Sequence, residues 1–148
     1  MRRRLVAALV TCLVVISAPS FAQRPEAFTA RLDWVPIGGT ERNDVAGEGS
    51  LSAKLSGTNL TIAGSFTGLP AKVTGAKLHA GVATGARGRG LVVADLQVTG
   101  AASGTVSGDV RLSAEQVAAL KAGQLYVQIY SEKGVLPDHS TLWGWLLP

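Results

Sequence analysis

The chain has 148 residues, a length that suits one domain, and 47% of them are hydrophobic, which is enough to form a core. Its single cysteine excludes an internal disulfide and a cysteine-based metal cage. The formal net charge of +4 points to an acidic partner such as nucleic acid, provided that the basic residues belong to the folded domain.

The first 22 residues have the pattern of a secretory signal peptide. Three arginines follow Met1, an apolar run covers residues 5–16, and small residues precede an expected cleavage site after Ala22. The run is shorter than the ~20 residues that span a bilayer, so we expect cleavage and export, periplasmic or extracellular, without stable membrane insertion. Two alternatives stay open: an uncleaved anchor, and lipidation of Cys12, although the preceding Thr11 is atypical of a lipobox.

Cleavage would change the charge balance of the protein. Three arginines leave with the segment, which lowers Lys+Arg from 14 to 11 against 10 Asp+Glu and leaves a net charge of +1. The only cysteine leaves as well. The basic balance therefore gives no reason to expect a nucleic-acid partner.

Residues 23–148 predict a single all-β domain. Short stretches alternate apolar with polar residues and are separated by Gly, Pro, Asn or Ser, which is the pattern of antiparallel strands. The apolar positions are, in chain order, Leu51, Ala53 and Leu55; Leu60, Ile62 and Phe66; Val92, Ala94, Leu96 and Val98; Val106, Val110 and Leu112; Leu125, Val127 and Ile129; and Leu142 and Leu146. About eight strands with turns between them predict an antiparallel, Greek-key-like β-sandwich.

One segment departs from the strand pattern and predicts a short helix. Ser113 is a suitable N-cap, and Gln116 three positions later completes a capping box. Val117 and Leu120 follow at helical spacing, and Gly123 is placed to end the helix. We expect this helix to cross one end of the sandwich and to pack its apolar residues against it, because so short a helix is marginal alone.

Three stretches of the chain resemble the CHRD domain, which is named from the animal protein chordin and also occurs in many bacterial secreted proteins. They are Gly68-Leu69-Pro70, residues 73–81 (VTGAKLHAG) and residues 112–127 (LSAEQVAALKAGQLYV), of which the last is the most specific. The resemblance extends from about Phe28 to Leu147 and implies an exported β domain.

The chain departs from the CHRD pattern at its histidines. Where the family typically has His-Ile-His, this chain has Lys77-Leu78-His79, and a typical histidine after the Tyr-Val strand is Tyr130 here. A histidine-based site of the family is thus largely absent. Because the activity of the family is mostly unassigned outside chordin, which antagonises growth factors, the resemblance implies little about mechanism.

A polar and aromatic surface is predicted from two of the strands. Lys77 and His79 alternate with Leu78 and so point away from its apolar face, while Tyr126 and Tyr130 lie opposite the apolar face of their own strand. If the two strands are neighbours, these four polar residues form a surface for a ligand or a partner. The alternative, which we favour, is that His79 and the tyrosines cover the sheet and hydrogen-bond locally.

A glycine-rich segment over residues 85–90 contains Arg87 and Arg89. It lacks the spacing of a phosphate-binding loop and the interleaved aromatic residues of an RNA-binding segment. We expect a loop before the strand that begins near Leu91, with two arginines that could contact an anionic surface of a partner.

Few residues offer chemistry for a metal site or for catalysis. A metal site needs three or four converging ligands, and residues 23–148 contain only His79 and His139 beside scattered carboxylates such as Asp138. Asp138-His139-Ser140 contains the residue types of a hydrolase triad, but consecutive residues in a turn led by Pro137 rarely converge. We expect no catalytic set, no metal and no cofactor.

The sequence as a whole predicts an exported, non-enzymatic CHRD-domain protein. It would act as a binding or structural module for an unidentified extracytoplasmic protein or ligand, with no nucleic-acid partner. The alternative is a small metal- or ligand-binding β-sandwich, an enzyme accessory or a superoxide dismutase-like protein, that uses His79 and its neighbours.

Overall fold

A computed structural model describes residues 24–39, 41–81 and 90–148 of the chain. The predicted signal peptide and the predicted partner contacts Arg87 and Arg89 lie outside the described residues. The described residues form one α-helix, α1 (Ala114–Lys121), one short 3-10 helix, η1 (Glu41–Asp44), and the strands β1 (Glu26–Trp34), β2 (Glu48–Ser56), β3 (Asn59–Thr67), β4 (Val73–Ala80), β5 (Leu91–Gly100), β6 (Gly104–Arg111), β7 (Leu125–Val135) and β8 (Ser140–Trp145).

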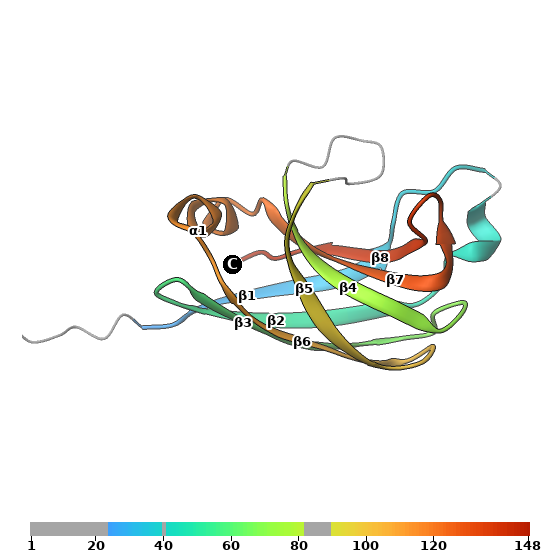
Figure 1. Cartoon of the computed structure of the whole chain (residues 1–148), viewed down its shortest axis with the longest axis horizontal. Coiled ribbons are helices and arrows are strands. Elements are labelled where there is room, and N and C mark those ends of the chain that lie inside the picture. Colours follow the sequence, from blue (N-terminus) through green and yellow to red (C-terminus); the bar gives the residue numbers. More distant parts are fainter. Residues whose placement is uncertain (1–23, 40, 82–89) are drawn as a thin grey trace, which may run out of the picture.

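The strands pair antiparallel in the order β1-β2-β3-β6-β5-β4-β7-β8 and close into a barrel (Figure 1). The prediction of a β-sandwich was therefore wrong in this respect, although the all-β class, the eight strands and the short helix are confirmed. Two strands make the closure. β1 pairs with β2 over residues 26–32 and with β8 at residues 33 and 34, and β5 pairs with β4 up to Leu96 and with β6 from Gln97.

The order of strands in the barrel follows from the connections along the chain. β4, β5 and β6 are consecutive neighbours, and the chain then returns through α1 to place β7 beside β4. The resulting order β7-β4-β5-β6 is that of a Greek key. This return brings β7, which is distant in sequence, against β4 and β8. The outward side of β4 and of its neighbours β5 and β7 carries the candidate site described below.

The predicted apolar positions lie in the core or pack against it, with one exception, and the core also includes Phe28, Ala30 and Leu32 of β1. Val92 is 56% exposed, whereas its neighbour Val93 packs against the core. The pairing of β4 with β5 shifts register between Leu78 and His79, so that one extra residue of β5 enters the ladder at this point. A bulge of this kind reverses which side chains point inward, and strict alternation along the sequence does not foresee it.

The predicted helix is confirmed, together with its capping box. Ser113 Oγ accepts a hydrogen bond from the Gln116 N–H at 3.2 Å, and Gln116 Oε1 accepts one from the Ser113 N–H at 2.8 Å. α1 lies at one end of the barrel (Figure 1), where Leu120 is fully buried and Val117 packs against the core. Within the described residues, no helix combines the length and the apolar character needed to cross a membrane.

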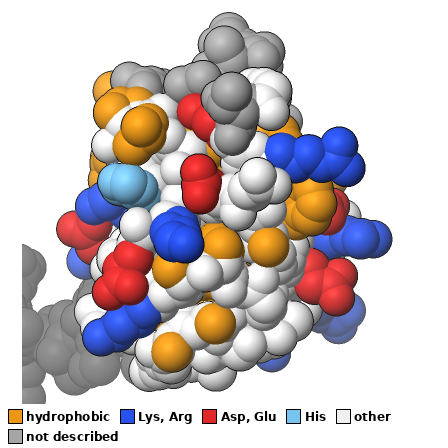
Figure 2. All heavy atoms as spheres, turned by 90° about the vertical axis from the view of Figure 1, so that its right-hand side faces the viewer, with side chains coloured by type: hydrophobic (Ala, Val, Ile, Leu, Met, Phe, Trp, Pro, Cys, Tyr) orange, Lys and Arg blue, Asp and Glu red, His pale blue; other side chains and the backbone are white. Residues whose placement is uncertain are grey.

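The surface carries charges of both signs at the other end of the barrel. Figure 2 shows this end, with Lys and Arg side chains beside Asp and Glu side chains and hydrophobic side chains scattered between them. Interspersed charges give no extended field of one sign on this face. This distribution agrees with the near-neutral balance that the sequence gives for residues 23–148.

Candidate functional site

The outward side of β4 and its two neighbouring strands places the predicted polar residues next to one another. The register sets Lys77 opposite Gln128 of β7 and His79 opposite Tyr126. On its other side, Lys77 lies opposite Asp95 of β5. The condition under which the sequence predicted a common surface, that the two strands are neighbours, is thus met.

His79 is buried and uses both of its ring nitrogens. Nδ1 lies 3.1 Å from the Gly90 carbonyl oxygen and Nε2 lies 2.9 Å from the Tyr130 hydroxyl. Because a carbonyl oxygen only accepts, Nδ1 carries the proton and donates, and the neutral ring accepts the Tyr130 O–H at Nε2. Burial lowers the pKa of His79, only partly offset by the hydrogen bond to Gly90, so the neutral form is favoured.

Tyr126 lies against His79 and completes a clamp around Gly90. The two rings stack with centroids 5.0 Å apart and planes inclined by 7°, and the Tyr126 hydroxyl accepts the Gly90 N–H at 2.7 Å. The Gly90 carbonyl therefore meets His79 while its N–H meets Tyr126. On the other side, Trp143 and Trp145 contact the Tyr126 ring edge-on, with centroids 5.8 and 4.9 Å away.

Both tyrosines of this cluster stay protonated at neutral pH. Burial raises the pKa of Tyr126, and it raises that of Tyr130 further, with an additional contribution from the negative charge of Asp138. A phenol that stays protonated keeps its donor hydrogen. The Tyr130 O–H can therefore hold the His79 ring in a single orientation.

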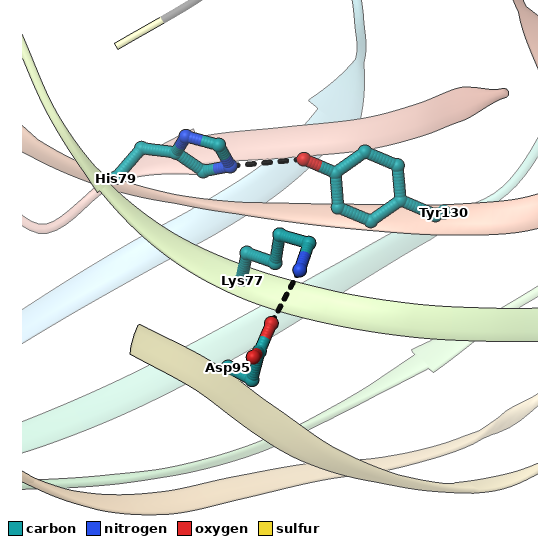
Figure 3. Close-up of polar contacts among 4 residues, drawn as sticks. All are labelled: Lys77, His79, Asp95 and Tyr130. Atoms are coloured by element: carbon teal, nitrogen blue, oxygen red, sulfur yellow. Dashed lines mark hydrogen bonds and ion pairs between the residues drawn. The ribbon is translucent and has the colours of Figure 1, made fainter. Parts of the chain in front are cut away.

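Lys77 and Asp95 form an ion pair beside the His79–Tyr130 pair (Figure 3). His79 and Lys77 project from β4, Tyr130 from β7 and Asp95 from β5, so that three strands contribute to this small region. The side chains of Lys77 and Asp95 are 39% and 77% exposed. An ion pair this exposed contributes little to stability, about 0–1 kcal/mol, but it neutralises the charge of the lysine locally.

These side chains line an open groove of about 700 Å³ over the outward side of β4. A volume of this size lies within the range of ligand sites, about 300–1,000 Å³. We call this hollow the β4 groove; the polar residues that line it include Lys77, His79, Asp95, Gln128, Tyr130 and Asp138.

Gln128 is the least expected member of the β4 groove. It is only 5% exposed, and its side-chain amide makes no hydrogen bond to the described residues. Among the described residues, every side-chain N or O that is fully enclosed has a hydrogen-bond partner. The unpaired amide of Gln128 is therefore not fully enclosed and opens to the groove that it lines. The sequence analysis did not assign Gln128 or Asp95 to this surface, because only the strand register places them beside Lys77. It named Asp138 only as a carboxylate near the two histidines.

The segment with the composition of a hydrolase triad forms the turn between β7 and β8. Asp138 accepts a hydrogen bond from the Ser140 N–H at 3.3 Å, and His139 is exposed with a positive φ of 58°. These contacts are those of a tight turn, as the sequence predicted. Among the described residues, no three His, Cys, Asp or Glu side chains are grouped so that they could hold a metal ion.

Of the six residues predicted to form a ligand or partner surface, four come together. Lys77, His79 and Tyr130 line the β4 groove, while Tyr126 lies behind His79 and supports it. A family model described as the CHRD domain matches residues 28–134, which include most of β1, all of β2 to β6, α1 and most of β7. No curated protein and no solved structure matches the chain.

Proposed function

The chain belongs to the CHRD domain family, and on that premise we propose that it is an exported, non-enzymatic module that binds a ligand or partner in the β4 groove. The observation that carries this proposal is the groove itself, whose wall is held in place by the contacts among His79, Gly90, Tyr126 and Tyr130. A site whose walls are fixed before binding loses less conformational entropy when the ligand arrives.

The state of the polar groups supports binding rather than catalysis. A general base needs an acceptor atom that can reach the substrate, and Nε2 of His79 already accepts the Tyr130 O–H. Lys77 is paired with Asp95, and the raised pKa values of both tyrosines keep them protonated. The cluster is therefore suited to hold the shape of the groove rather than to move protons.

The N-terminal segment supports the export part of the proposal. Residues 1–22 have the basic start, the apolar run and the small residues of a signal peptide. Expression of the full-length gene in a bacterial host tests this directly by cell fractionation and intact-mass measurement. We expect a processed protein that begins at Gln23 in the extracytoplasmic fraction; an unprocessed chain in the cytoplasm would refute export.

The binding part of the proposal is tested with the processed protein and a variant of the β4 groove. Wild type, Lys77→Ala and the control Ser52→Ala, on the exposed face of β2, are incubated with an extracytoplasmic extract of the native organism. We expect a set of bound molecules that Lys77→Ala depletes and Ser52→Ala does not. Equal capture by all three proteins would show that the groove is not the binding surface.

Metal analysis of the same protein, purified without a histidine tag, addresses the alternative of a metal site at His79. Both ring nitrogens of His79 are occupied by hydrogen bonds, so we expect no stoichiometric copper or zinc. One equivalent of metal that is lost in His79→Ala would favour the alternative instead.

A further inference from the structure

We infer that the β4 groove binds an uncharged polyhydroxyl ligand, such as a segment of a carbohydrate chain. This inference rests on the proposed function, because it takes the groove as the binding surface and names the chemistry of its occupant. Three independent features of the groove support it: the amide of Gln128, the balance of charge, and the exposed apolar surface of Val92 on the β5 side.

The amide of Gln128 is the strongest of these features. It is almost completely buried, it opens to the β4 groove, and it has no hydrogen-bond partner among the described residues. Because no enclosed side-chain N or O of the described residues lacks a partner, the amide must be reachable from the groove, where only water or a ligand can pair with it. An amide offers two N–H donors and a carbonyl acceptor, so its partner must both accept and donate.

The charges around the groove disfavour an ionic ligand. Lys77 is paired with Asp95, and His79 is held neutral by burial and by its two hydrogen bonds. Among the described residues that line the groove, no cation remains unpaired to bind a carboxylate or a phosphate. The remaining charge is the carboxylate of Asp138, which repels anions and already accepts the Ser140 N–H.

Hydroxyl groups match the polar atoms that the groove presents. A hydroxyl both donates and accepts, so it can donate to the Gln128 carbonyl or to the Asp138 carboxylate and accept from the Gln128 N–H. The Tyr130 hydroxyl gives its hydrogen to His79, and its oxygen can still accept. A ligand with several hydroxyls can satisfy these groups together, whereas a ligand with only donors or only acceptors leaves some unpaired.

The β5 side of the groove offers apolar surface beside the polar residues Asp95 and Gln97. Leu96 and Val98 line it from the edge of the core, and Val92 is 56% exposed because the bulge in β5 turns it outward. Ligand sites commonly combine such apolar walls with a few polar groups that fix orientation. A sugar ring has this dual character, since its C–H face packs on apolar side chains while its hydroxyl edge reaches polar ones.

The experiment is an NMR titration of the ¹⁵N-labelled processed protein with five probes. Three are neutral trisaccharides (cellotriose, maltotriose and tri-N-acetylchitotriose), and two are charged controls (trigalacturonate and trilysine). We expect at least one neutral probe to bind saturably and to shift the amide signals of Lys77, Gln128 and Tyr130. The charged controls should not shift these signals.

The variant Gln128→Leu gives a second readout that does not depend on the choice of sugar. Leucine has a similar size but no polar atoms, so it should weaken binding of the neutral probe at least tenfold, while Ser52→Ala leaves binding unchanged. The same variant should not lower the Tm of the free protein, because the amide that it removes opens to the groove and has no hydrogen-bond partner among the described residues. A lowered Tm would show that Gln128 has a structural partner and would overturn the inference.

The remaining outcomes separate this inference from the proposed function. Shifts in the groove with trilysine or trigalacturonate alone would show that the ligand class is wrong while the groove remains the binding surface. If no probe shifts the groove but capture from the extract still depends on Lys77, a protein partner replaces the carbohydrate. Neutral probes that bind equally to wild type and Gln128→Leu would place the sugar elsewhere and overturn the inference.

Discussion

The two sides of the barrel have the same alternation of residues but very different outer faces. On β2 and β3 the outward positions are exposed and, apart from Glu48 and Lys54, short. The strand register pairs Ser52 with Thr29 of β1 and Ser50 with Ser65 of β3. On β7 the outward positions Tyr126, Gln128 and Tyr130 are buried, so residues 125–131 are buried on both faces of the strand. We call these the hydroxyl face and the aromatic face.

The two faces contribute differently to the packing of the barrel. The hydroxyl face meets water with small groups, and its strands depend on the core and the backbone ladder. The aromatic face adds a second layer of packing outside the barrel, in which the rings of Tyr126, Trp143 and Trp145 meet edge-on. Through Tyr126, which stacks on His79, this layer supports the wall of the β4 groove, so stability and the candidate site both depend on Tyr126.

The largest expected difference between the faces concerns Tyr126. Tyr126→Ala removes a buried ring that contacts His79 and two tryptophans, and should lower the free energy of unfolding by about 3–5 kcal/mol. Ser52→Ala on the hydroxyl face should change it by less than about 0.5 kcal/mol. Urea denaturation followed by tryptophan fluorescence measures both values.

If Tyr126→Ala and Ser52→Ala lowered the free energy of unfolding by similar amounts, the proposed difference between the two faces would be wrong. If Tyr126→Ala does not fold, Tyr126→Phe still tests the contrast, because it keeps the ring and removes only the hydroxyl that accepts the Gly90 N–H. That variant should fold and lose about 1–2 kcal/mol.

A second contrast compares one hydroxyl on each face. Tyr130→Phe leaves Nε2 of the buried His79 without its donor and should cost about 1–3 kcal/mol. Thr61→Val removes a hydroxyl that donates to Asp109 at 2.7 Å, but in an exposed position where water replaces it, so the cost should stay within about 0.5 kcal/mol. Equal costs by chemical denaturation would mean that the His79–Tyr130 hydrogen bond is not sheltered from water.

The sequence predicted the inner side of this barrel better than its outer side. Alternation placed Leu78, Val127 and Ile129 in the core because period two decides which residues share a face. It could not decide between two sheets and a closed barrel, since that choice depends on how far β1 and β5 extend past one neighbour to reach the next.

The candidate site shows the same limit. Alternation put Lys77 and His79 on one face and the tyrosines on another, but only the register of β4 with β7 brings Gln128 next to Lys77. Burial of an outward face is also not visible in alternation, because tyrosine and glutamine occur on exposed strands as well. The bulge that exposes Val92 results from a register shift between β4 and β5, and no short sequence motif predicts such a shift.

A third prediction uses pH to test how deeply His79 is sheltered. Its folded pKa lies below the ordinary value of 6.5, mainly because of burial, so the unfolded chain binds a proton more readily. The free energy of unfolding should therefore fall as the pH drops below about 6.5, and this loss is complete once the pH is below the lowered pKa of the folded protein.

Urea midpoints at about pH 7.5 and pH 5.5 measure this loss in the wild type and in His79→Gln. The variant is less stable at both pH values, but it lacks the titrating ring and should therefore show the smaller drop between them. An equal drop in the two proteins would assign the pH dependence to other groups. The hydroxyl face has no histidine among its described residues, so the comparison isolates the aromatic face.

The smallest effect concerns charge, and here the two faces should agree. Lys77 pairs with Asp95 beside the aromatic face, and Arg31 pairs with Asp33 at 3.3 Å on the outward side of β1, where Arg31 lies opposite Ser50 of the hydroxyl face. All four side chains are more than a third exposed, so water and salt screen both pairs. Double-mutant cycles with Lys77→Met and Asp95→Asn, and with Arg31→Met and Asp33→Asn, should each give a coupling below about 1 kcal/mol.

The two couplings should also weaken together when sodium chloride is raised to about 1 M, because the Debye length then falls to about 3 Å. A coupling for Lys77 and Asp95 that is clearly larger and insensitive to salt would mean that the aromatic face shelters the ion pair as well as the rings. Lys77 would then be held more firmly than its exposure indicates, which would strengthen the argument that it is unavailable to an anionic ligand. If the two ion pairs have similar couplings, the faces differ only in their apolar packing and their buried hydrogen bonds.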